Sequence, residues 1–303
     1  MAPDVLFVNG FHRSGTTLLT SAVTEAVGGI TTTVGHLARH ILTLDAFMTA
    51  LAAQNGAAQN GADRGVDKLQ VTHATAEEYG FLLQKKTGKQ ALYGHRDNLD
   101  YLREHIDELA EESPSGTVVL KNPWEMGQER RLLADFPQAR VILLRRRVAD
   151  IERSMAAALT HAEGSRGYGQ ALTGDRDGNQ RLDRTLSSPR RRRILLALIR
   201  LVLRRRIRRL LRTVRALPPD RVAFLTYDEL RGDPATGAAW AAHVLDPEAL
   251  AKAFTRHAFT DAKEPAPSGR MADALDRRWA KAWDRARAAQ VRSGVLTPGV
   301  GTS

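Results

Sequence analysis

The segment GFHRSGTTLL, from Gly10 to Leu19, follows the apolar run Val5–Val8 after a single residue, Asn9. A short apolar run predicts a buried strand, and the residues that follow the loop have the pattern of a helix. In a strand–loop–helix unit, backbone N–H groups of the loop and of the first helical turn converge on an anion. Gly15 allows the backbone to approach such an anion closely, and the neighbouring hydroxyls can donate hydrogen bonds. The segment therefore predicts a phosphate-like ligand after the first strand.

This loop differs from the phosphate loop of nucleotide hydrolases. Their motif places a lysine after the second glycine, and a following Ser or Thr binds Mg²⁺. Here Thr16 follows Gly15, and the nearest cation is Arg13. A P-loop kinase acting on a small molecule is an alternative hypothesis. Such a kinase would need that lysine and a set of Mg²⁺ ligands.

Short apolar strands alternate with helices along the chain, which predicts an α/β fold with a mainly parallel sheet covered on both faces. We expect the ligand at the carboxyl ends of the strands. Residues 1–303 are expected to form a single domain. The predicted strands cover residues 4–8, 117–121, 139–145 and 221–227, and the predicted helices cover residues 16–27, 34–51, 74–86, 99–112, 125–134, 148–160, 190–217, 234–244 and 270–292.

Composition limits the functional classes. The 303 residues include no cysteine, which excludes disulfides, thiolate zinc sites and a cysteine nucleophile. The first residues lack the basic and then apolar layout of a secretory signal. No uninterrupted apolar run reaches the roughly 18 residues of a membrane span. We therefore expect a cytoplasmic protein.

The positive charge is concentrated in one element. The chain carries a net charge of +11, and twelve arginines lie between Arg190 and Arg215 with no acid among them. Arg190–Arg193 begin a predicted helix, where the helix dipole disfavours cations by roughly 0.3–1 kcal/mol each. An anionic neighbour would offset that cost, such as an acidic partner, a membrane surface or an anionic acceptor. Nucleic acid is not expected because no aromatic residues interleave with the arginines to stack bases. A non-catalytic basic module that docks on a membrane or on nucleic acid is a further alternative.

Two motifs resemble those of the sulfotransferases that use 3′-phosphoadenosine-5′-phosphosulfate (PAPS). The phosphosulfate loop of that family, Lys/Arg-Ser-Gly-Thr-Thr, is matched by Arg13, Ser14, Gly15, Thr16 and Thr17. A second family motif, Arg-x₃-Asp-x₃-Ser after a strand, is matched by Arg146, Asp150 and Ser154 in VILLRRRVADIERSM. The resemblance implies a P-loop-like sulfotransferase fold with a donor-binding site made of these residues.

In the family, the arginine and serine of the second motif bind the 3′-phosphate of the donor. An arginine at a strand end and a serine two helical turns later can indeed contact one phosphate. The resemblance therefore implies that Arg146 and Ser154 bind PAPS and its product adenosine 3′,5′-bisphosphate. It also implies that no metal is needed. The reaction expected is transfer of a sulfuryl group to a hydroxyl, or less readily to an amine.

Three residues are predicted to act in catalysis. Arg13 takes the place of a family lysine that stabilises the charge on the leaving group, and Lys121 resembles a second family lysine. The acceptor hydroxyl needs a base. Pro123 stands where steroid- and phenol-sulfating relatives have a histidine, so this position provides no base. We take His36, just past the first helix, as the first candidate for the base instead. The alternatives are Glu125, His95 and His40.

The segment before the basic helix bears on the acceptor. Residues 161–189 are rich in glycine and charge and show no periodicity, which is typical of a lid or binding segment. We expect these residues to form an acceptor-binding flap that leads into a basic helix at residues 190–217. The predicted acceptor is a small molecule, natural product, glycan or lipid, with anionic or amphiphilic character. Contact with a membrane surface through Arg190–Arg215 is a second expectation.

Overall fold

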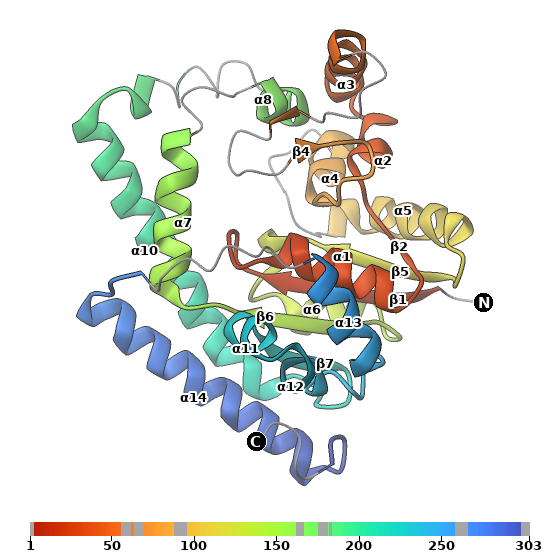
Figure 1. Ribbon diagram of the computed structural model, residues 1–303, viewed down its shortest axis with the longest axis vertical. Coiled ribbons are helices and arrows are strands. Elements are labelled where there is room, and N and C mark those ends of the chain that lie inside the picture. The colour runs from red at the N-terminus through yellow and green to blue at the C-terminus, as the bar shows by residue number, and fades with distance from the viewer. Residues whose placement is uncertain are drawn as a thin grey trace.

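The computed structural model describes residues 3–55, 62–63, 70–87, 96–161, 167–174, 181, 184–257 and 266–297 (Figure 1). In this part of the chain, a five-stranded sheet has the strand order β2-β5-β1-β6-β7, and all of its pairings are parallel. Its strands are β1 (Asp4–Gly10), β2 (Ile30–Thr31), β5 (Thr117–Lys121), β6 (Arg140–Arg145) and β7 (Val222–Thr226). The predicted α/β fold class is confirmed.

Helices cover both faces of the sheet. Val5 and Phe7 of β1 join a core with α5 (Leu99–Glu112), α6 (Glu129–Asp135), α10 (Pro189–Thr213) and α14 (Arg270–Arg292). Leu6 and Val8 join a second core on the opposite face, with α1 (Thr16–Ala26), α12 (Pro234–Ala239) and α13 (Pro247–His257). Alternate residues of one strand point to opposite faces, so the Val5–Val8 run of β1 is apolar throughout and buried on both sides.

A third apolar cluster lies outside these two cores. It unites α2 (Val34–Ala38), α3 (Leu42–Asn55), α4 (Gly80–Thr87) and α8 (Gly167–Thr173), which Figure 1 shows grouped together above the sheet. A short hairpin of β3 (Ala62–Asp63) and β4 (Gln70–Val71) lies in the same part of the sequence. Two further helices of the described residues are α7 (Val148–His161) and α11 (Tyr227–Gly232).

Several predicted elements are confirmed, and others need correction. The bounds of α5, β5 and α14 agree with the predictions. The single helix expected at residues 34–51 is in fact two, because the chain turns between α2 and α3 and lets both bury their apolar residues in the third cluster. The helix expected from residue 74 begins only at Gly80, and the one expected at residues 125–134 is α6, preceded by a 3₁₀ turn at Pro123–Glu125. The helix expected at residues 234–244 ends at Ala239, and β2, α11 and α13 were not predicted.

The region expected to be a flap contains regular structure. Its residues 167–173 form α8, whose Tyr168, Ala171 and Leu172 are buried in the third cluster. Thr43 of α3 donates a hydrogen bond from Oγ1 to the carbonyl oxygen of Ala171 at 2.6 Å. The structure describes α8 and a few residues before α10, and the rest of residues 161–189 lies outside the described ranges. This segment is therefore anchored to the third cluster through α8.

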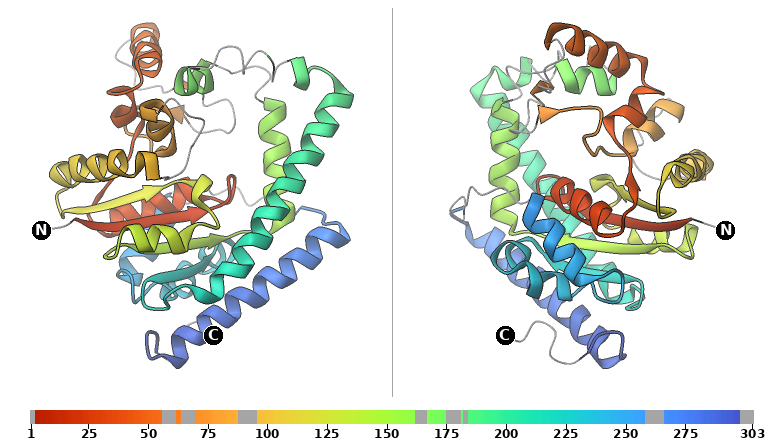
Figure 2. Two further views of the ribbon diagram at one scale, coloured as in Figure 1. Left: turned by 180° about the vertical axis from the view of Figure 1, so that it is seen from behind. Right: turned by 45° about the vertical axis from the view of Figure 1, so that its right-hand side comes forward.

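The basic helix is α10, and it is followed by a 3₁₀ turn at Val214–Ala216 rather than continuing to residue 217. Apolar residues at spacings of three and four form one stripe along this segment, in which Leu203, Ile207, Leu210 and Val214 are buried, whereas Leu196 and Ile199 are only partly covered. Figures 1 and 2 show α10 beside α7 at one edge of the molecule. Among the described residues, no helix has both the length and the apolarity to cross a membrane.

Candidate active site

The loop after β1 has a strained backbone that brings it close to its surroundings. Arg13 has a φ of 68°, and Gly15 has a φ of 96°. A side chain at Gly15 would be strained by this φ and would also place a Cβ 2.6 Å from the Tyr227 ring. α1 begins at the next residue, and in the described structure its N-cap makes no side-chain hydrogen bond to the first turn. The N-terminus of α1 therefore has the uncapped N–H groups that favour an anion.

The two predicted anion motifs meet in the structure. Nε of Arg13 donates a hydrogen bond to Oγ of Ser154 in α7 at 3.1 Å. Nη1 of Arg146 donates to the backbone carbonyl of Arg13 at 2.8 Å, and its guanidinium lies 4.6 Å from the centre of the Tyr227 ring. Residues that are far apart in sequence thus place two guanidinium groups and a serine hydroxyl around the loop.

Lys121 supplies a third cation from the neighbouring strand. It ends β5, which pairs with β1 so that Lys121 is opposite Val8. Its Nζ donates to Oγ1 of Thr17 at 2.7 Å and lies 3.9 Å from Oε1 of Glu77. The side chain is only 1% exposed, so its ammonium is held at a fixed position beside the start of α1.

The loop itself retains an unsatisfied polar group. Oγ of Ser14 is fully buried and has no hydrogen-bond partner among the described residues. Buried hydroxyls are normally hydrogen-bonded, so an orphaned one beside an uncapped helix N-terminus and three cations fits an anionic ligand. The residues predicted to bind the phosphosulfate group therefore have the chemistry that such a group requires. Among the described residues, no three His, Cys, Asp or Glu side chains are grouped so that they could hold a metal ion.

Two adjacent acids that were not predicted lie beside these cations. Glu77 is fully buried, and its Oε2 accepts a hydrogen bond of 2.7 Å from the hydroxyl of Tyr168 in α8. Its Oε1 lies 3.9 Å from Lys121 Nζ. In the sequence these two acids stand among apolar residues, in AEEYGF. A carboxylate that is buried without partners is costly, so this setting could have indicated that the two acids have specific partners.

Glu78 contacts His12 of the loop and Trp124. Its Oε2 accepts a hydrogen bond of 3.1 Å from Nε1 of Trp124 and lies 3.6 Å from Nε2 of His12. The His12 and Trp124 rings are also in edge-on contact, with centroids 4.6 Å apart. The side chains of Glu78 and His12 are 9% and 29% exposed, so this acid reaches solvent slightly, whereas Glu77 is fully buried.

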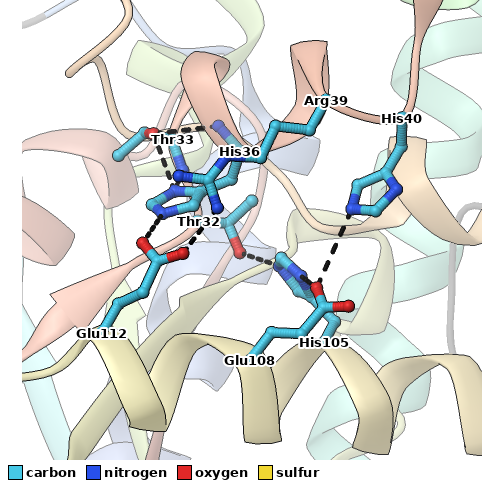
Figure 3. A network of polar contacts seen from close by, with 8 residues as sticks. All are labelled: Thr32, Thr33, His36, Arg39, His40, His105, Glu108 and Glu112. Atoms are coloured by element: carbon cyan, nitrogen blue, oxygen red, sulfur yellow. Dashed lines mark hydrogen bonds and ion pairs between the residues drawn. The ribbon is translucent and has the colours of Figure 1, made fainter.

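His36, the first candidate for the base, belongs to a different network (Figure 3). Its Nδ1 accepts from the backbone N–H of Thr33 at 3.0 Å in a capping box at the start of α2. Its Nε2 is 3.1 Å from Oε2 of Glu112, which also binds Arg39. Both ring nitrogens therefore have partners, Nδ1 at the start of α2 itself and Nε2 on α5, and the contacts of His36 are separate from those of Arg13, Lys121 and Ser154.

The other base candidates are placed as follows. Nε2 of His40 lies 3.8 Å from Oε2 of Glu108 in the same network (Figure 3). His105 also belongs to this network, and burial lowers its pKa to about 4. Glu125 is buried and accepts a hydrogen bond of 3.2 Å from the hydroxyl of Tyr79. Burial raises the pKa of that Tyr79 hydroxyl well above its usual value. His95 lies outside the described residues.

Comparison with known proteins identifies the family. A family model described as "Sulfotransferase family" matches residues 3–246. The chain belongs to the sulfotransferase family. No curated protein sequence matches this sulfotransferase significantly.

Two solved structures share the fold of this sulfotransferase. STF9 from Mycobacterium avium has 17% identity and a TM-score of 0.57, with 94% of this chain and 77% of that chain covered. STF1 from Mycobacterium tuberculosis H37Rv also has 17% identity, with a TM-score of 0.51 and coverage of 93% and 77%. Both are titled sulfotransferases, and at this identity they establish the P-loop-like fold.

Proposed function

We propose that this sulfotransferase transfers a sulfuryl group from PAPS to a hydroxyl of a small molecule, natural product, glycan or lipid. The observation that carries the proposal is the contact between Arg13 and Ser154. It joins the loop motif to the second anion motif, so one continuous site offers cations and hydroxyls to a donor with phosphates at both ends. An amine acceptor is the less favoured form of the same reaction.

The donor, when bound, supplies the sulfuryl group and a phosphate as leaving group. Arg13 and Lys121 are the cations assigned to the negative charge that develops on that leaving group. Lys121 is well placed for this role, because Thr17 and Glu77 hold its ammonium in position. Ser14 and the first turn of α1 offer hydrogen-bond donors to the same group. Arg146 and Ser154 are assigned to the 3′-phosphate.

We assign the acceptor base to Glu78 in place of His36. A base must reach the acceptor, and Glu78 is the partly exposed member of the acid pair. Glu77 is fully buried against Lys121 and Tyr168, so its role is to position the lysine. His36 has both ring nitrogens engaged with Thr33 and Glu112.

Thermal shift tests this function against its main alternative. Adenosine 3′,5′-bisphosphate, added without metal, should raise the melting temperature, because a ligand at 100 times its Kd stabilises a protein by about 2.7 kcal/mol. A P-loop kinase would instead be stabilised by ATP with Mg²⁺, and a non-catalytic basic module by neither. Stabilisation by ATP with Mg²⁺ and none by the bisphosphate would overturn the proposal.

A further inference from the structure

α10 carries apolar side chains on two opposite sides, an exposed set nearer its N-terminus and a buried set nearer its C-terminus. Leu203, Ile207 and Leu210 are buried against the core. A second set, which we call the outer apolar face, is exposed to 45–54%: Ile194, Leu198, Leu201 and Val202. At about 100° per residue, Ile194 lies about 180° from Leu203 around the helix. A helix of a globular protein normally turns a polar face to solvent, so this second apolar face needs a partner.

The outer apolar face points away from the neighbouring helix. Arg200 and Arg204 pair with Glu152 of α7 at 3.5 and 2.8 Å, which fixes the side of α10 that faces α7. Figures 1 and 2 show α7 on the inner side of α10 and α10 at the edge of the molecule. The outer apolar face is therefore presented outward over a length of about two helical turns.

Arginines bracket this face at both ends. Arg190 and Arg191 precede it, and Arg205 and Arg208 follow it; all four are exposed. By the helical repeat they lie on the same side of α10 as the apolar side chains. The segment from Arg190 to Arg215 contains no acid to neutralise them. A shallow hollow with a volume of about 210 Å³ also opens here, lined by Thr185, Arg191, Ile194, Leu195 and Leu198.

Apolar and cationic groups on one helix face select among partners. A second copy of the chain placed face to face would bring like charges together, which is costly. Nucleic acid would use the arginines, but it would gain nothing from aliphatic side chains without aromatic stacking. An anionic bilayer uses both, since aliphatic side chains enter the acyl boundary and arginines bind the headgroups.

We propose that the outer apolar face of α10 docks on the surface of an anionic lipid bilayer. α10 lies along the surface with Ile194, Leu198, Leu201 and Val202 inserted and the bracketing arginines at the level of the headgroups. The contact is peripheral, because no described helix can cross a membrane. The inference does not depend on the donor chemistry and is tested without measuring sulfation.

The absence of cysteine allows a site-specific probe. A Leu198→Cys variant, labelled with an environment-sensitive fluorophore, is mixed with vesicles of phosphatidylcholine and phosphatidylglycerol or of phosphatidylcholine alone. We expect a blue shift with the anionic vesicles, and a much smaller one with the neutral vesicles. The matched control is Leu42→Cys on α3, whose side chain is 76% exposed and lies outside the proposed face. An equal shift at both positions, or none with anionic vesicles, would overturn the proposal.

Two multiple variants separate the apolar and the cationic contributions. Leu198→Ser with Leu201→Ser and Val202→Ser should lower co-sedimentation of the unlabelled protein with anionic vesicles by at least about tenfold. Arg190→Gln with Arg191→Gln and Arg205→Gln should have an effect of similar size and should weaken the salt dependence of binding. Circular dichroism and melting temperature verify folding.

The competing partners give distinct results. Vesicle binding that survives both multiple variants overturns the proposal. A lipid-free dimer that the serine variant dissociates, measured by light scattering, would show that a second copy occupies the face. RNA binding without vesicle binding would show that the arginines serve nucleic acid, and either result replaces the bilayer as the occupant.

Discussion

Nε of Arg13 donates a hydrogen bond to Oγ of Ser154 across 3.1 Å, although the two residues are 141 positions apart. Arg13 belongs to the loop after β1, and Ser154 lies in α7, two helical turns beyond Arg146. The contact means that the loop cation and the serine assigned to the 3′-phosphate lie at one site. The effects of replacing each should therefore overlap in donor binding and differ in catalysis.

The first prediction concerns Arg13. Arg13→Ala should lower kcat much more than it weakens binding of adenosine 3′,5′-bisphosphate, because its interaction with the leaving group grows as charge develops in the transition state. Ser154→Ala should weaken binding of the bisphosphate and have a smaller effect on kcat. Arg13→Lys, which keeps a cation, should retain measurable activity. Steady-state kinetics together with calorimetric binding measure both quantities. If Arg13→Ala and Ser154→Ala changed binding equally and left kcat intact, Arg13 would serve only to bind phosphate.

The second prediction concerns Arg146. Its guanidinium holds the carbonyl of Arg13 and stacks on Tyr227, so it is fixed beside the loop. Arg146→Ala should remove a charge-assisted contact worth on the order of 1.5–3 kcal/mol. The Kd of the bisphosphate, measured by calorimetry, should rise at least about tenfold. Arg147→Ala is the matched control, because that side chain is 33% exposed and pairs with Asp150. Equal affinities for the two variants would contradict the assignment.

The third prediction separates Glu78 from His36. Glu78→Gln removes the proposed base and should lower kcat by about 10²–10⁴-fold while bisphosphate affinity changes little. His36→Asn should instead lower the melting temperature, because it disturbs the link between α2 and α5, and it should leave kcat within a few-fold of the parent value. A large loss of kcat in His36→Asn at unchanged stability would restore the histidine as the base.

The residues proposed to bind the donor could be singled out from the sequence because their signals are local. The anion loop depends on a strand, a glycine and hydroxyls that are consecutive in the sequence, and Arg146 and Ser154 lie within one strand–helix unit. The strand pattern also predicted a parallel sheet, whose carboxyl edge brings Lys121 near this loop. The contact between Arg13 and Ser154 itself is long-range, and only the family resemblance suggested that the two motifs share a ligand.

The contacts of the proposed acceptor base were not predictable, because they join distant segments. Glu77 and Glu78 were not singled out in the sequence, since their contacts are with Lys121, Tyr168 and Trp124 from three other elements. His36 was favoured because it is close to α1 in the sequence, but it forms a capping box with Thr33. The same tertiary packing divides the helix expected at residues 34–51 into α2 and α3.

The fourth prediction concerns a buried acid below the site. Burial raises the pKa of Glu129 from 4.5 to about 7, although Oε1 accepts a hydrogen bond of 2.7 Å from the backbone N–H of Gly127. Between these two pH values the folded protein holds a proton that the unfolded chain has lost. The free energy of unfolding should therefore fall as the pH rises from 4.5 to about 7, by on the order of 3 kcal/mol at most.

Glu129→Gln tests this dependence. The variant cannot ionise, so it should be more stable than the parent above about pH 7 and comparable with it near pH 4.5, the usual value. Urea unfolding at a series of pH values measures the free energy. Glu104→Gln, which changes an exposed glutamate on α5, is the control and should leave the pH profile of the parent unchanged. A Glu129→Gln profile parallel to that of the parent would show that Glu129 does not titrate in this range.

The last prediction concerns the link between α8 and the buried acid pair. The hydroxyl of Tyr168 donates to Oε2 of Glu77 at 2.7 Å, and Glu77 in turn lies 3.9 Å from Lys121. Tyr168→Phe leaves a buried carboxylate oxygen with one partner fewer, so the lysine loses part of its positioning. We expect a lower kcat and, because α8 belongs to the proposed flap, a higher acceptor KM, whereas bisphosphate affinity stays nearly unchanged. Thr173→Val, which removes an exposed hydroxyl from the same helix, is the matched control. A purely structural role would lower the melting temperature of Tyr168→Phe without this split between acceptor kinetics and donor binding. That outcome would remove Tyr168 from acceptor recognition and leave the described part of the flap with a packing role against α3.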